Sequence, residues 1–144
     1  MKMKKAQIST AVLAYQIYGN GKVDLVIEMG LGAVAAEWQP VVKCLAGKHT
    51  VLLYERAGYG ESGSSELVRT PANIAKELYE LLQTLDCEKQ IILLAHSQGG
   101  LYAQQFVRSY PTFVKKLILL DPLSAKDSSF RQELTAEEFR KSGV

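Results

Sequence analysis

Residues 91–100 constrain the fold of this chain more than any other stretch. The run 91–95 is apolar at every position, which is typical of a strand that is buried on both faces. Small residues follow it around Ser97, and residues 101–107 then show the pattern of a helix. The stretch therefore predicts a strand, a very tight turn with Ser97 at its apex, and a helix.

Such a turn suits a serine that acts as a nucleophile. A serine hydroxyl attacks weakly unless it is lifted clear of the backbone, within reach of a base and of N–H donors that stabilise an oxyanion. Ala95 and Gly99 are small enough for the strand and the helix to pass closely while Ser97 is strained. The pattern is the G-x-S-x-G nucleophile elbow with alanine in place of the first glycine, so Ser97 is the candidate nucleophile.

Apolar runs elsewhere predict further strands. Residues 23–29, 50–55 and Val114–Leu120 are such runs. Residues 5–18 alternate between apolar and polar, and a Gly-Asn-Gly turn joins them to the first of these runs. This N-terminal part predicts two or three strands connected by hairpins.

Helical patterns separate the runs. Residues 33–45 form the first, and Pro40 should kink this helix or mark a fresh start. Its apolar stripe consists of Trp38, Val41, Val42 and Leu45. Thr70 and Pro71 begin a second helix, and residues 135–138 form a capping box for a short last one. The alternation predicts one α/β domain over residues 1–144, with a mostly parallel sheet, helices on both faces and an N-terminal antiparallel hairpin.

Three glycine-bearing turns follow three consecutive buried strands. They comprise residues 28–32, 55–62 and 95–100. In a doubly wound sheet all three turns lie at the carboxyl edge, where ligands bind.

In their order and spacing these turns resemble those of the α/β-hydrolase superfamily, in its branch of small esterase-like serine hydrolases. There the first turn reads H-G or E-x-G-x-G and the second D-R-x-G-x-G-x-S. The resemblance extends from the hairpin to residues 121–122. It implies a hydrolase that acts on an ester, thioester, lactone or amide of a small molecule through an acyl-enzyme, with no metal and no organic cofactor.

Carried over residue by residue, the resemblance makes Ser97 the nucleophile. The backbone N–H groups of Gln98 and Leu31 match the two oxyanion donors, and the first of these lies at a helix N-terminus. Arg56 belongs to the second motif, which we interpret as a structural loop beneath the site, and Glu55 replaces the aspartate that is usual there.

The chain departs from the family in its histidines. The family order is serine, then aspartate or glutamate, then histidine, and no histidine follows Ser97. His96 is adjacent to the nucleophile, and we interpret it as a hydrogen-bonded structural residue. His49 precedes a strand, so we expect it at the opposite edge of the sheet. Asp121 is a candidate acid, with the alternative that it caps the turn at Pro122.

The run Val114–Leu120 is a second departure. As the last strand it would leave a long apolar edge open, which native proteins avoid. We therefore expect the N-terminal part of a hydrolase fold, truncated after about six strands. The lid and later strands would then be absent, and this edge would pair with a second copy or a second chain. Without the family histidine we expect the chain alone to be inactive or very weak.

Two alternatives from other classes stay open. The first is a non-catalytic module with the same fold, or one half of a split enzyme, which binds a partner. The second is a dinucleotide-binding oxidoreductase domain, because residues 30–35 fit G-x-G-x-x-A and Glu55 ends the next strand, where a ribose-binding acid would lie.

Composition limits the kinds of partner and the cellular location that we expect for this protein. The formal net charge is +2 and its lysines and arginines are scattered, which argues against a nucleic-acid partner. No apolar run approaches the length of a membrane span. The two cysteines lack metal or redox spacing, and the N-terminal residues lack the apolar core of a signal peptide. We therefore expect a cytoplasmic protein.

Overall fold

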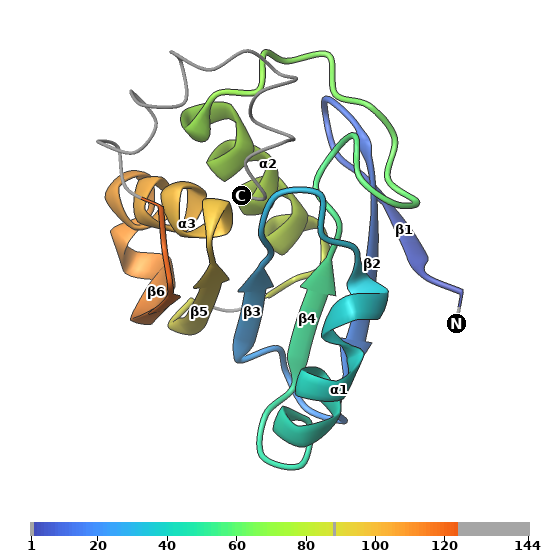
Figure 1. Cartoon of the computed structure of the whole chain (residues 1–144), viewed down its shortest axis with the longest axis vertical. Helices are drawn as coiled ribbons and strands as arrows, with labels where there is room; N and C mark the ends of the chain where they lie inside the picture. Colours follow the sequence, from blue (N-terminus) through green and yellow to red (C-terminus); the bar gives the residue numbers. More distant parts are fainter. Residues whose placement is uncertain (1, 88, 124–144) are drawn as a thin grey trace.

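The computed structural model describes residues 2–87 and 89–123 of the chain. One mixed sheet of six strands forms its centre, in the order β1-β2-β4-β3-β5-β6 (Figure 1). The strands are β1 (Lys4–Gln7), β2 (Val12–Tyr18), β3 (Leu25–Glu28), β4 (Val51–Tyr54), β5 (Ile91–His96) and β6 (Val114–Leu120). The helices are α1 (Ala35–Leu45), α2 (Pro71–Thr84) and α3 (Gln98–Ser109), with a short 3-10 turn, η1 (Pro111–Phe113), before β6.

The N-terminal part forms one hairpin. Strands β1 and β2 pair antiparallel, which confirms the predicted hairpin. Strand β2 then pairs with β4 and not with β3, so the expectation of a second hairpin is wrong. The cause is a set of contacts at Thr50, just before β4, whose side chain accepts from the Gly21 N–H (3.0 Å) and whose carbonyl accepts from the Asp24 N–H (3.1 Å). The connection therefore wraps around the start of β4 and places β3 on its far side.

Helices cover both faces of the sheet, as predicted. On one face, alternate residues of the central strands pack against α2 and α3. The residues in this cluster include Val26, Leu52, Leu93, Leu78 and Phe106. On the other face their neighbours pack against α1, through Ile27, Leu53, Leu94 and Val42. Because the central strands are buried on both sides, their sequences are apolar without alternation.

The helix boundaries follow local signals. Helix α2 starts at Pro71, and the Thr70 side chain accepts a hydrogen bond from the Asn73 N–H (3.1 Å), as the sequence predicts. Helix α1 continues through Pro40, so no fresh start occurs there. Val41 is 44% exposed and does not belong to the buried stripe. In the part of the chain that the structure describes, no helix is long and apolar enough to cross a membrane.

Strand β6 lies at an edge of the sheet, beside β5. Within residues 2–87 and 89–123 its outer side has no partner strand, and Leu119 and Leu120 are exposed. The position confirms the expected open edge, and pairing with another chain stays a prediction. The capping box expected at residues 135–138 lies outside the described residues.

Candidate active site

Ser97 occupies the tight turn that the sequence predicts. Strand β5 ends at His96 and helix α3 begins at Gln98, so a single residue makes the turn. Its backbone has φ 51° and ψ −122°, a conformation that non-glycine residues rarely adopt. The Ser97 N–H donates to the Leu120 carbonyl (3.1 Å), and its own carbonyl accepts from the Leu123 N–H (2.9 Å). The neighbouring strand and its following turn therefore hold the strained residue in place.

Glycine after the turn allows the elbow to contact the end of β3. A Cβ atom on Gly99 would lie 2.3 Å from the Glu28 carbonyl oxygen and 2.5 Å from that of Met29. No side chain fits there without moving backbone. The small residue that the motif requires is thus needed for close packing of α3 on β3.

A cavity of about 660 Å³ opens beside the turn. Its lining consists of Gly30, Leu31, Ala33, Glu37, Trp38, His96, Ser97 and Asp121. The structure thus brings three of the predicted site residues, Ser97, Leu31 and Asp121, to one cavity. Gln98 lies next to it, and its side chain donates to the Tyr102 hydroxyl and lines a second cavity of about 510 Å³.

The two predicted oxyanion donors are unused within residues 2–87 and 89–123. No hydrogen bond from the Leu31 N–H or the Gln98 N–H is found there. Gln98 is the first residue of α3, whose early N–H groups have no partner within the helix. Gly30 is close to the elbow, since a Cβ atom on it would lie 3.4 Å from the Ser97 Cβ. The turn after β3 therefore lies against the serine.

The two histidines lie apart from each other. The His96 ring packs edge-on against Trp38, with ring centres 5.9 Å apart. No hydrogen bond of its side chain is found among the described residues, so this ring contact holds it instead of the bond we expected. His49 Nδ1 lies 2.8 Å from Asp24 Oδ2, just before β3 and thus at the opposite edge from Ser97, as predicted. Neither arrangement supplies the missing base.

A buried ion pair lies beneath the turn after β3. Arg56 Nη1 donates to Glu28 Oε1 (2.6 Å), and the Tyr54 hydroxyl donates to the other carboxylate oxygen. Burial alone would lower the pKa of Arg56, but the Glu28 carboxylate raises it above its ordinary value. The Arg56 guanidinium therefore stays charged. This pairing was not predicted, although a glutamate that ends an otherwise apolar strand requires a partner.

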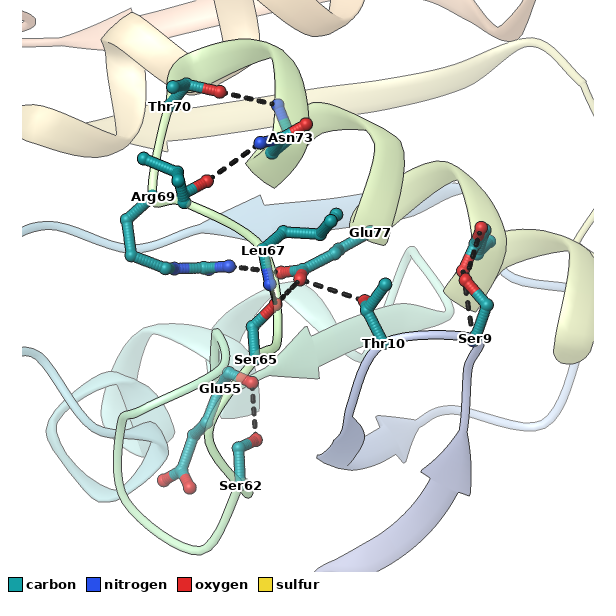
Figure 2. Close-up of polar contacts among 12 residues, drawn as sticks. Ser9, Thr10, Glu55, Ser62, Ser65, Leu67, Arg69, Thr70, Asn73 and Glu77 are labelled. Atoms are coloured by element: carbon teal, nitrogen blue, oxygen red, sulfur yellow. Dashed lines mark hydrogen bonds and ion pairs between the residues drawn. The ribbon is translucent and has the colours of Figure 1, made fainter.

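Glu55 has a structural role in this arrangement. Its carboxylate is buried and accepts from the Ala35 N–H (3.1 Å) and the Glu61 N–H (2.6 Å). The acid that a dinucleotide site would need for the ribose is therefore already bonded to backbone. Its own carbonyl accepts from the Ser62 hydroxyl (2.6 Å), which fixes the following loop (Figure 2).

Polar contacts anchor that loop to α2 and to the first hairpin (Figure 2). The buried Glu77 carboxylate accepts from the Thr10 hydroxyl (3.0 Å), from Arg69 Nη1 (2.8 Å) and from the Ser65 hydroxyl. The connection between β4 and α2, which carries Arg56, is thus tied down at both ends.

Comparison with known proteins shows to which family this chain belongs. The sequence model of a family described as alpha/beta hydrolase fold matches residues 25–142. The chain belongs to the α/β-hydrolase family. This membership confirms the family resemblance of the three turns, and the mixed sheet with helices on both faces is the fold that it implies.

Individual proteins show what this α/β hydrolase resembles. The uncharacterized protein YqjL of Bacillus subtilis is 30% identical over 124 residues, which are 86% of this chain and 48% of that protein. The pimeloyl-(acyl-carrier protein) methyl ester esterase of Proteus mirabilis is 33% identical over 106 residues, 74% of this chain and 39% of the esterase. A thermophilic esterase structure from Thermogutta terrifontis superposes with a TM-score of 0.77 at 26% identity, covering 89% of this chain and 50% of that one. This α/β-hydrolase chain thus spans between about two fifths and one half of the length of these three proteins.

Proposed function

We propose that the chain carries the nucleophile and the oxyanion donors of a serine hydrolase that cleaves an ester, thioester, lactone or amide. One observation carries the proposal. The strained Ser97 borders a cavity, and neither the N–H of Gln98, which follows it, nor the N–H of Leu31, in the turn after β3, bonds to anything in the described residues. The family membership supports it, as do the ester-cleaving activities named for two similar proteins.

The reaction follows from these groups. Ser97 Oγ attacks the substrate carbonyl carbon and loses its proton to a general base, while the carbonyl oxygen gains the charge and accepts from the Leu31 and Gln98 N–H groups. Collapse of this adduct breaks the bond to the leaving group, which takes the proton, and leaves Ser97 acylated. Water then attacks the acyl carbon with the help of the same base, the bond from that carbon to Ser97 Oγ breaks, and the carboxylic acid leaves as Oγ regains its proton.

The base must come from a group other than the two histidines. Since His96 packs on Trp38 and His49 is bound to Asp24, neither is arranged to accept the Ser97 proton. Asp121 lines the cavity, so we propose that it orients or balances the charge of a base that enters there.

Added imidazole tests the proposal because it can replace the missing base. The chain is incubated with p-nitrophenyl acetate, with and without imidazole, and the acetylated residues are mapped by peptide mass spectrometry. We expect acetylation at Ser97 that depends on imidazole and that disappears in Ser97→Ala. An equal extent of acetylation at Ser97 and at the exposed Ser109 would contradict the proposal, because Ser97 would then have no special reactivity.

A further inference from the structure

We propose that Arg56 is a positioning residue for this acyl transfer, which sets the direction of the Leu31 N–H by holding the Gly30 carbonyl. The inference rests on the proposed function, because it concerns one of the two donors that the reaction uses. The turn at residues 55–62, which contains Arg56, would then orient the N–H donor in the turn at residues 28–32.

The guanidinium of Arg56 holds the end of β3 through three acceptors. Its Nη2 donates to the Gly30 carbonyl (2.8 Å), and its Nη1 donates both to the Met29 carbonyl and to Glu28 Oε1 (2.6 Å). The guanidinium is planar and its donors form a rigid fork, so the two successive carbonyls are held in a fixed relation.

The peptide between Gly30 and Leu31 transmits this constraint. A trans peptide is one rigid plane in which the carbonyl and the N–H point in opposite directions, and the described residues contain no cis peptide. Because the Gly30 carbonyl points toward Arg56, the Leu31 N–H must point away from it. A flipped peptide would lose the Arg56 bond and would turn a carbonyl oxygen toward the position where the oxyanion forms.

Arg56 is itself held firmly. It is 4% exposed, and its guanidinium lies 4.8 Å from the ring centre of Tyr59 and 4.9 Å from that of Tyr102. Such contacts between a cation and two aromatic faces, together with the paired carboxylate of Glu28, stabilise this orientation of the guanidinium. The orientation of the donor is therefore fixed before any substrate binds.

Three variants test the inference. Arg56→Lys keeps the charge beside Glu28 and removes the fork. Arg56→Met combined with Glu28→Gln removes the fork without leaving an unpaired buried charge. Arg69→Met is the matched control, because it also breaks an arginine–glutamate pair (with Glu77, 2.8 Å), whereas Arg69 donates no hydrogen bond to the turn after β3 within the described residues.

Two measurements are made on each variant. The first is acetylation of Ser97 in imidazole as a function of ester concentration, which gives the limiting rate and the half-saturating concentration. The second is the backbone amide resonance of Leu31 and its hydrogen-exchange rate, recorded by NMR on the intact chain.

We expect both Arg56 variants to lower the limiting rate by about 10- to 100-fold, with little change in half-saturation and with a displaced Leu31 resonance. The Arg69→Met rate should stay at that of the original chain. Folded Arg56 variants that react at the original rate would overturn the inference. If Ser97 of the original chain is not acetylated at all, the proposed function fails. The Leu31 amide then decides the inference alone, since an unmoved resonance overturns it and a displaced one supports it.

Discussion

At the scale of single residues, Ser97 and Gly99 show how backbone conformation and close packing are combined at the elbow. Both were predicted from the sequence, because a small residue two positions after a serine reports a steric requirement that is local to the turn. The pairing of Glu28 with Arg56 was not predicted, because Glu28 ends β3 and Arg56 lies in the loop after β4, and only the folded sheet brings them together. A glutamate at the end of one strand and an arginine after another are compatible with many different pairings, so the sequence alone does not select this one.

The strain at Ser97 can be measured by replacement with glycine. Glycine adopts φ 51° without steric cost, whereas alanine keeps the strain and lacks the hydroxyl. We expect Ser97→Gly to be more stable than Ser97→Ala by about 1 kcal/mol in urea unfolding, after allowance for the greater freedom of unfolded glycine. Both variants should fail to be acetylated at this position. A glycine variant less stable than the alanine variant would contradict the strain.

The close approach at Gly99 gives a second prediction. Gly99→Ala would force a methyl group onto the Glu28 and Met29 carbonyl oxygens, and only backbone can move. We expect a loss of roughly 3 kcal/mol of unfolding free energy. Gly47→Ala is the control, because a Cβ atom there meets nothing within 4 Å. Similar losses for both substitutions would show that the contact at Gly99 is not the cause.

At the scale of elements, boundaries were predictable and distant pairings were not. Helix α2 matched its prediction because Thr70 and Pro71 and an apolar face all lie within one short segment. The predicted partner strand of β2 was wrong. The Gly-Asn-Gly turn is typical of a hairpin, whereas the pairing of β2 with β4 depends on contacts at Thr50, which is distant in the sequence. The prediction that Val41 belongs to the buried stripe of α1 was wrong, because an apolar residue type does not show how wide a face of the helix the sheet covers.

The attachment of α2 to the hairpin predicts a difference between two glutamates. Glu77 is 3% exposed and accepts from Thr10 and Arg69, whereas Glu80 is partly exposed and accepts from the Ser9 hydroxyl (2.7 Å). We expect Glu77→Gln to cost about 1–3 kcal/mol of unfolding free energy, because a charged acceptor is lost in a buried cluster. Glu80→Gln should cost less than about 1 kcal/mol. Urea unfolding of both variants checks the order, and a reversed order would refute it.

At the scale of the whole molecule, Asp24 and His49 form a polar contact at the edge of the sheet opposite to Ser97. Burial alone would raise the pKa of Asp24, but hydrogen bonds from His49 and from the Thr50 N–H outweigh it and lower that pKa. Asp24 therefore stabilises the fold above the pKa of the unfolded chain, about 4. This stabilisation is lost as the pH falls through the lower value of the folded state.

Asp24→Asn tests this assignment. We expect the melting temperature of the variant to fall less between pH 6 and pH 3 than that of the original chain. The acetylation of Ser97 in imidazole should be unchanged, because Asp24 lies at the other edge of the sheet. An identical pH dependence in both chains would show that this carboxylate does not contribute.

The predictable part of the site is its location. Three turns after parallel strands had to meet at one edge, and the cavity beside Ser97 lies there, lined also by Leu31 and Asp121. The base was not predictable, since neither histidine is arranged for that role and no pattern in the sequence indicates another group.

The neighbouring positions of β3 and β5 have a consequence for how such a protein can change. Glu28 is paired with Ala95 in the sheet although α1, β4 and α2 lie between them along the chain. The alignment of the serine with the turn that faces it is thus set by hydrogen bonds between adjacent strands and not by the length of the intervening segment. Residues inserted in the solvent-facing bend at 46–48 should therefore leave the distance between the turn after β3 and the elbow at Ser97 unchanged.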